Sequence, residues 1–532
     1  MRSPKELALR LKQEAANAWL LANPPSPAIH PNLRIPGLPD PAPVFERLQG
    51  SDFARSVEDL AGQILNHSIP VLGYTLETGP EISWRRDYIH AKESGCAYFR
   101  RIPYLDFERV GDHKLVWELN RHQHLVLLAQ AYRFTGRKEF LQEISVQLES
   151  WLSANPYQRG MNWASALEVA FRALSWTWLY HFAGEALDLD LRSQLLTGLY
   201  RHGLHLEHNL SIYFSPNTHL LGEAVALHAL GVLFPTFPGA KRWARKAIDI
   251  VRKQMQSQVR DDGSHFEQSS YYHIYALDLF LFHAALAQTM PEYRARLRRM
   301  AEYLRGLMGP RGALSLIGDD DGGRVFHPYG PRDRFGRATL ATCAVMFDHP
   351  EWLQDSANLH EQAVWWLGEK ALAAQPGAPE AFRSQLFPQA GMAVMRAGDL
   401  RVLMNAGPFG FGGAGHSHAD KLSILVDLGE EEILVDAGTY TYVSDPKWRN
   451  WFRSTAAHNT VRVDGRDQAA PAGPFRWASK PEVIIADWLT LAAFDYVDAS
   501  CAYGLRHRRR ALLLKPDLLF ILDELSGPKA SI

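Results

Sequence analysis

Apolar residues recur every three or four positions through the middle of the chain, with Arg and Glu between them, from about residue 112 to residue 370. This repeat is typical of amphipathic helices. We expect helices at 117–132, 139–151, 164–180 and 191–210, and further helices that begin near residues 220, 240, 268 and 291. Many helices of similar length joined by short connectors indicate paired helices packed as a toroid or solenoid.

The pattern changes near Pro376-Gly377, where short β-branched runs separated by Gly and Asp replace the helical repeat. Such runs predict antiparallel strands and turns. We expect strands at 391–395, 422–427, 432–436, 459–465, 481–485, 510–514 and 518–523. A large sheet normally has more strands than these, so we expect the sheet domain to be incomplete at its C-terminus.

The 532 residues exceed what one hydrophobic core usually holds, so we expect several domains. Residues 1–100 are a lead-in with helices and a Pro-rich stretch, residues 101–375 form the helical domain, and residues 376–532 form the antiparallel sheet domain.

Composition excludes several classes of protein. The formal net charge is −1, which does not favour a nucleic-acid binder, so a polyanionic partner would have to meet local positive charge. The three cysteines lie far apart, which argues against a disulfide framework and a cysteine metal site. No signal peptide and no membrane span are visible, so we expect a soluble protein, cytoplasmic as written and periplasmic if residues precede Met1. The oligomeric state stays open.

Three segments are rich in polar residues where the apolar repeat would not place them. In the first, Asn217 follows Pro216 at a loop-to-helix junction, and a helix cap is the simplest interpretation. In the second, Tyr271, Tyr272 and His273 are adjacent, and aromatic packing with satisfied polar tips would explain them.

The third polar segment holds His416 and His418 among glycines, just before a predicted strand. Residues two apart on an extended chain share a face, and antiparallel pairing could bring His418, Asp436 and His458 together. Two imidazoles and a carboxylate suit Zn²⁺ in a structural role, whereas a hydrogen-bonded His–Asp pair is the alternative. The aspartates at 319–321 lack the ligand spacing of a calcium loop, and we expect a solvated turn there.

Taken together, these motifs resemble the heparinase II/III family, whose relatives include alginate, oligoalginate and heparan sulfate lyases. The resemblance covers about residues 100 to 525. It is carried by the segments Asn217-Thr218-His219, Tyr271-Tyr272-His273, His416 to Asp420, Asp436 to Tyr440, Arg453 to Thr460, and Gly160 to Trp163 with Glu168 and Arg172. It implies an incomplete (α/α) toroid, an antiparallel sandwich-like sheet domain, and an active site between them.

The resemblance also implies roles for single residues. Asn217 would neutralise a uronate carboxylate, Tyr272 and His416 would move the protons, and His418, Asp436 and His458 would hold a structural zinc. Contacts to an acidic polysaccharide or oligosaccharide substrate are expected from His219, Asn162, Trp163, Arg172, Tyr271 and Tyr440. Some relatives carry a basic residue just after the tyrosines, where this chain has Ile274 and Tyr275.

A β-elimination explains why the chemistry needs these groups. Removing the C5 proton of a uronic acid places charge on its carboxylate, which a donor such as Asn217 stabilises. A base must reach C5 and an acid must protonate the departing O4, and which of Tyr272 and His416 does which stays open. An ionised tyrosine needs nearby positive charge, for which Arg172 and Arg453 are candidates.

Two other functions compete with a lyase. A hydrolase would need two carboxylates in the cleft, and the candidates are Glu168, Glu223 and Glu267. A non-catalytic glycan-binding protein of surface-polysaccharide assembly is the other possibility. The tryptophans that could stack on sugar rings are Trp163, Trp176 and Trp178, and for at least two of them the helical spacing favours core packing.

Overall fold

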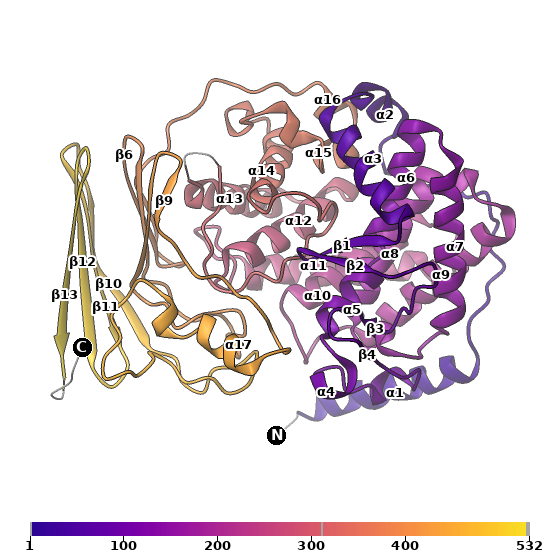
Figure 1. The fold of residues 1–532 in the computed structure, drawn as a ribbon, viewed down its shortest axis with the longest axis horizontal. Helices are drawn as coiled ribbons and strands as arrows, with labels where there is room; N and C mark the ends of the chain where they lie inside the picture. The colour runs from indigo at the N-terminus through magenta and orange to yellow at the C-terminus, as the bar shows by residue number, and fades with distance from the viewer. Residues whose placement is uncertain (1–2, 310–311, 528–532) are drawn as a thin grey trace.

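The computed structural model describes residues 3–309 and 312–527 and consists of a helical half joined to a β-sheet half (Figure 1). This arrangement confirms the predicted fold class of a toroid followed by antiparallel sheets. In the described part of the chain, no helix is long and apolar enough to cross a membrane.

Four helices form the inner layer of the toroid, and each packs on the next. They are buried on nearly all sides, because their sequences are apolar around the whole circumference. The inner helices are α6 (Gln123–Thr135), α8 (Ala166–Ala183), α10 (Thr218–Leu233) and α12 (Ser270–Leu286). Each has a more polar outer partner, namely α7 (Lys138–Ala154), α9 (Leu189–Asn209), α11 (Ala240–Gln258) and α13 (Pro291–Leu307).

Shorter elements complete the helical half. Three helices close the ring after α13: α14 (Asp333–Phe347), α15 (Ala363–Leu367) and α16 (Glu369–Leu372). The first hundred residues form α1 (Pro4–Ala22), α2 (Ala42–Leu48), α3 (Asp52–Leu65) and the strand pairs β1 (Ser68–Val71) with β2 (Tyr74–Glu77) and β3 (Arg86–Asp87) with β4 (Lys92–Glu93). Two helices, α4 (Phe107–Val110) and α5 (His113–Asn120), lead into α6.

The predicted continuous helix at 117–132 is wrong, because the chain breaks between α5 and α6. His122 has a left-handed φ of 60°, and its Nδ1 accepts a hydrogen bond of 2.8 Å from the Trp176 indole. Both side chains are buried, so this bond stabilises the break. The break places Arg121 at the cavity described below.

The sheet half consists of two antiparallel sheets. The first has the order β5 (Gln385–Phe387), β6 (Met392–Ala397), β7 (Leu400–Asn405), β8 (Ser423–Leu428) and β9 (Glu431–Leu434). The second has the order β10 (Glu482–Thr490), β11 (Phe494–Ala502), β12 (Arg506–Leu514) and β13 (Leu518–Ser526). Apolar residues of β6, β7 and β8 form one core with those of β11 and β12, so the sheets pack face to face.

The predicted strand at 459–465 is wrong. The segment is irregular and makes only an isolated bridge, between Val463 and Arg466. Its side chains bond to neighbouring backbone instead of joining a ladder: Asn459 donates to the carbonyl of Val435, and Thr460 donates to that of Lys421. A short helix, α17 (Pro446–Phe452), precedes it and was not expected from the sequence.

Candidate active site

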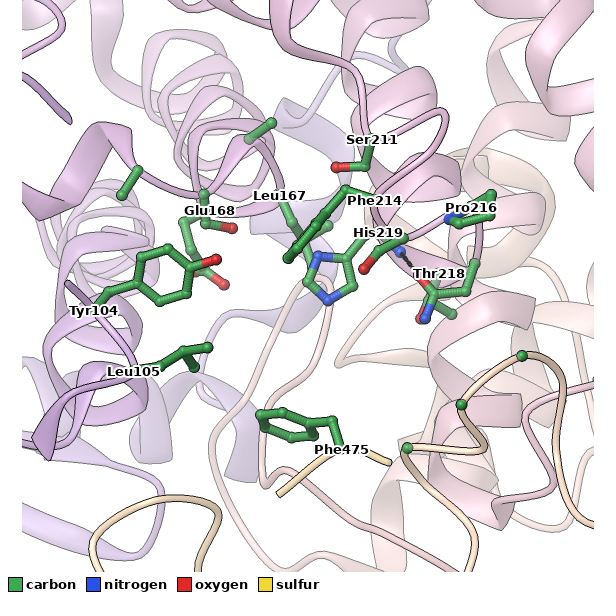
Figure 2. Close-up of a pocket in the computed structure, with 18 of the residues that line it drawn as sticks. Tyr104, Leu105, Leu167, Glu168, Ser211, Phe214, Pro216, Thr218, His219 and Phe475 are labelled. Atoms are coloured by element: carbon green, nitrogen blue, oxygen red, sulfur yellow. Dashed lines mark hydrogen bonds between the residues drawn. The ribbon is translucent and has the colours of Figure 1, made fainter. Parts of the chain in front are cut away.

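A cavity of about 680 Å³ opens between the two halves. The helical half lines it with the start of α10, the first turn of α12 and the loop at 210–217, and the sheet half lines it with the glycine-rich loop at 410–416 and with Tyr442 and Phe475. Figure 2 shows the His219 ring pointing into this space, with Glu168 and Tyr104 on one side and Phe475 below. The cavity therefore contains groups from both domains.

Asn217 is both a helix cap and a cavity residue. Its Oδ1 accepts the backbone N–H of His219 at 3.1 Å, which caps α10 as the sequence predicts. Its Nδ2 donates to Glu267 at 2.6 Å, and the Thr218 hydroxyl donates to the same carboxylate at 2.7 Å. The second amide hydrogen of Asn217 is left for another acceptor.

Tyr272 and His416 meet across the boundary between the halves. Their rings stack with centroids 3.7 Å apart, and the Tyr272 hydroxyl lies 3.1 Å from that of Tyr442. Burial raises the pKa of Tyr272 well above its ordinary value, and the neighbouring Tyr442 adds to the shift. Tyr272 therefore stays protonated at neutral pH in the free protein.

His219 reaches into the cavity from the first turn of α10. Burial lowers the pKa of its imidazole to about 4, and the nearby His416 adds to the effect. The ring is therefore neutral at neutral pH, and it presents a hydrogen-bonding group rather than a charge.

Asp319 is not singled out by the sequence, which predicts a solvated turn at 319–321. Its side chain is fully buried and lies 3.1 Å from Nδ1 of His416 and 2.9 Å from Nε2 of His418. Burial works against its charge, but Arg449 outweighs this and holds the pKa of Asp319 well below its usual range. The triple Asp itself, just before two glycines, was the only signal in the sequence.

A network of opposite charges forms one wall of the cavity. Arg121 makes two hydrogen bonds to Glu168, at 2.7 and 2.9 Å, and one to the Tyr275 hydroxyl at 2.8 Å. Lys114 lies 2.9 Å from Asp321. Positive charge thus reaches the tyrosine segment from Arg121 at the helix break, where the guanidinium bonds to the Tyr275 hydroxyl.

Three predicted substrate contacts lie away from the cavity. Asn162, Trp163 and Arg172 are at most 2% exposed, and none of them lines it. Arg172 donates to the carbonyl of Asn162 and to His202, and its guanidinium covers the Trp151 ring. These side chains stabilise the toroid core, so the prediction that they contact substrate is not supported by their placement.

Trp176 and Trp178 are also buried in the toroid core. For these two indoles the structure agrees with core packing, the role favoured by their helical spacing.

Tyr271 and Tyr440 do not line the cavity either. The Tyr271 ring lies under the guanidinium of Arg332, 4.6 Å away, so Tyr272 is the tyrosine of the pair that faces His416. Tyr440 is 67% exposed and stacks on Phe452.

The cation expected near Tyr272 is also a different residue. Arg172 lies in the toroid core, and Arg453 donates to the carbonyls of Gly473 and Pro474. Arg449 lies close by instead: its guanidinium is 4.9 Å from the centre of the Tyr442 ring, whose hydroxyl lies 3.1 Å from that of Tyr272. Burial nevertheless keeps the pKa of Tyr272 raised.

His418, Asp436 and His458 form a cluster whose ligand atoms lie within 4.8 Å of one another. Nδ1 of His458 lies 2.9 Å from Asp436, which leaves Nε2 of His458 and Nδ1 of His418 buried without a hydrogen-bond partner among the described residues. Two unpartnered imidazole nitrogens beside a carboxylate fit a divalent cation such as zinc.

Family models match most of the chain. The heparinase II/III N-terminal model matches residues 54–321, and the heparinase II/III-like C-terminal model matches residues 379–531. A heparin-sulfate lyase of Bacteroides stercoris is 23% identical over 79% of this chain and 63% of its own length. A heparin-sulfate lyase of Pedobacter heparinus is 24% identical over 79% of this chain and 61% of its own length.

Solved structures agree on the fold. A crystal structure of heparinase III superposes with a TM-score of 0.68 at 18% identity, covering 99% of this chain and 78% of that chain. A second heparinase III structure has a TM-score of 0.59 at 20% identity, covering 98% of this chain and 76% of that chain. The chain spans less than two thirds of the length of the two lyases named above. The two family models and the two-domain fold show that the chain belongs to the heparinase II/III family.

Proposed function

We propose that the protein is a polysaccharide lyase that cleaves a uronate-containing glycosaminoglycan by β-elimination. The observation that carries this proposal is the convergence of Asn217, Tyr272 and His416 on one cavity, from two different halves of the chain. The names of the heparin-sulfate lyase relatives support a glycosaminoglycan of the heparin or heparan sulfate class as the substrate.

Asn217 is built to stabilise the developing charge on the uronate carboxylate. One of its amide hydrogens is held by Glu267, so the amide plane is fixed before substrate binds. A donor fixed in advance stabilises the enolate-like transition state without reorganising during the reaction. The neutral His219 ring, which points into the same space, is a second donor.

The hydrogen bonds favour His416 as the base and Tyr272 as the acid. The ionised Asp319 can only accept, so Nδ1 of His416 donates to it and Nε2 is left to take the C5 proton. Tyr272 stays protonated because its pKa is raised, and it gives its proton to the departing O4.

Zinc would be held by His418, Asp436 and His458, and would supply a fixed positive charge that stabilises the segment between the glycine-rich loop and β8. The chain's own residues perform the proton transfers.

Three observations weigh against a hydrolase. Glu168 is held by two hydrogen bonds from Arg121, and Arg121 lowers its pKa against the effect of burial. Glu223 does not line the cavity, and its carboxylate accepts hydrogen bonds from the backbone N–H and the hydroxyl of Ser211. Glu267, the third candidate, lines the cavity but already accepts hydrogen bonds from Asn217 and Thr218. None of these three candidates is therefore the free carboxylate that glycoside hydrolysis needs.

Incubation with heparan sulfate, alginate and related polyuronates tests the proposal. The wild type should produce the ultraviolet absorbance of an unsaturated uronate with at least one of them, and Tyr272→Phe should not. Tight glycan binding without any product, unchanged in Tyr272→Phe, would instead favour a non-catalytic glycan-binding protein.

A further inference from the structure

Asp319 belongs to the helical half by sequence, between α13 and α14, but its side chain lies against residues of the sheet half. Four N–H groups surround its two oxygens. One oxygen meets Nε2 of His418 and one end of Arg449, and the other meets Nδ1 of His416 and the other end of Arg449. With four donors on two oxygens, the carboxylate has no acceptor site left for a cation.

This arrangement selects one tautomer for each histidine. A carboxylate kept ionised by Arg449 can only accept, so each imidazole nitrogen that faces it must carry the hydrogen. A neutral imidazole has one N–H, and its other nitrogen is an acceptor. His416 therefore presents Nε2 as its acceptor, and His418 presents Nδ1 toward Asp436 and His458.

The backbone fixes Asp319 in this position. The backbone N–H of Asp319 donates to the carbonyl of His416 at 2.9 Å, and the Ser269 hydroxyl donates to the carbonyl of Asp319. Gly318 has a φ of +67°, and a Cβ added there would lie 2.5 Å from the carbonyl oxygen of His416. Only glycine fits this close approach, so the loop and the histidine segment are held as one unit.

We propose that Asp319 is a positioning residue that sets the tautomers of His416 and His418 together. It thereby links the cation cluster to His416, the proposed general base in the cavity. The part that concerns His416 rests on the proposed lyase function. The part that concerns His418 does not, because it is about the cation cluster alone.

The variant Asp319→Asn tests this role, with Asp320→Asn as the matched control. The amide keeps the shape of the carboxylate but has one acceptor oxygen and one donor group, so it cannot accept from both histidines. We expect kcat to fall by about 100-fold or more with KM changed less than about 3-fold, because the substrate contacts remain. We expect zinc affinity, measured by competition with a chelator, to fall by about 10–100-fold.

Asp320 bonds to Arg332 instead of the histidines, so Asp320→Asn should keep the wild-type zinc affinity and kcat. If Asp319→Asn lowers only the melting temperature and retains wild-type kcat and zinc affinity, the residue is merely structural and the proposal is overturned. A wild-type protein that takes up no zinc overturns the part on the cation cluster.

If Asp319→Asn does not fold, a neutron structure of the wild type shows directly which nitrogens of His416 and His418 carry hydrogen. Hydrogens on Nδ1 of His416 and on Nε2 of His418 are the expected result, and a hydrogen on the opposite nitrogen of either ring overturns the proposal. Both the neutron result and the zinc titration are independent of turnover, so the failure of the lyase function would be recognised separately.

Discussion

At the scale of single residues, the Asn217 side chain uses its two ends for different purposes. Its oxygen caps α10, and its nitrogen is held by Glu267. The N–H of His219 and the carboxylate of Glu267 together allow the Asn217 amide only one orientation, since a flipped amide would face its oxygen toward the carboxylate. Oε1 of Glu267 also lies 3.7 Å from Nε2 of His416. Glu267 thus touches both the proposed carboxylate-binding group and the proposed base.

Replacing Glu267 with Gln should lower kcat by up to about 100-fold, because the amide of Asn217 loses its fixed orientation. The fold should persist, since Gln fills the same space. Steady-state kinetics with a melting curve measure both effects. The exposed Glu369→Gln is the control and should match the wild type. Equal kinetics in the two variants would show that Glu267 has no positioning role.

The buried Glu223 should make the stability of the protein depend on pH. Burial raises its pKa to about 8, against the opposing effect of its bonds to Ser211. Above the ordinary pKa of a glutamate, the unfolded chain has lost a proton that the folded protein keeps. The contribution of Glu223 to the free energy of unfolding is therefore fully present below the ordinary pKa and is lost as the pH rises through about 8.

The free energy of unfolding of Glu223→Gln should consequently equal that of the wild type near pH 4 and exceed it by about 2–4 kcal/mol at pH 8. Denaturant unfolding at several pH values measures the difference. A constant difference between the two proteins across this range would contradict the assigned titration.

Sequence motifs pointed to residues that the structure brings together at one cavity, but they did not reveal a residue whose importance depends on contact between distant segments. Asn217, Tyr272 and His416 lie in recognisable motifs at loop and helix boundaries. Asp319 lies 97 residues from His416 along the chain, and its role depends only on their contact. Conversely, Asn162, Trp163 and Arg172 share a motif with the family, but the motif serves the toroid core.

At the scale of elements, the first turn of α12 positions Tyr272. Ser269 caps this helix by accepting the backbone N–H of Tyr272 at 3.1 Å, and its hydroxyl also donates to the carbonyl of Asp319. One side chain therefore ties the helix that carries Tyr272 to the loop that carries Asp319.

Ser269→Ala should cost about 1 kcal/mol of stability through loss of the cap, and should also lower kcat because the loop loses an anchor. Ser51→Ala is a matched control, since Ser51 caps α3 in the same way, far along the chain from the cavity. We expect a similar loss of stability in the control without a change in kcat. An equal effect of both variants on kcat would contradict this account.

The sequence predicted most helices, because the outer ones are amphipathic and the inner ones are long apolar runs. It did not predict the break at His122, which depends on the tertiary bond to Trp176, nor the irregular segment at 459–465, whose side chains replace the ladder.

At the scale of the whole molecule, the cavity exists only while the two halves keep their relative position. Asp262, from the loop between α11 and α12, accepts the backbone N–H groups of Gln389 and Ala390 in the sheet half, both at 2.8 Å. Gln268 donates to the carbonyls of Ala390 and Pro408 nearby. These polar contacts bridge the two domains.

Asp262→Ala should destabilise the protein by about 2–4 kcal/mol, because two hydrogen bonds to a charged group are lost. It should also lower kcat, because Tyr272 and His416 belong to different halves. Asp261→Ala is the control: the Asp261 side chain makes an exposed ion pair with Arg296, worth under about 1 kcal/mol, and the substitution keeps the backbone N–H that donates to Gln389. Thermal unfolding and turnover of both variants provide the test, and unchanged turnover in Asp262→Ala would argue against a site that depends on this contact.

Product mass in ¹⁸O-labelled water tests most directly whether the protein cleaves its substrate by elimination, as proposed, or by hydrolysis. Elimination adds no water, so the two fragments of an acidic oligosaccharide should sum to the mass of the substrate, carry no ¹⁸O, and include one unsaturated uronate end. Fragments heavier together by one water, with ¹⁸O in the new reducing end, would contradict the account.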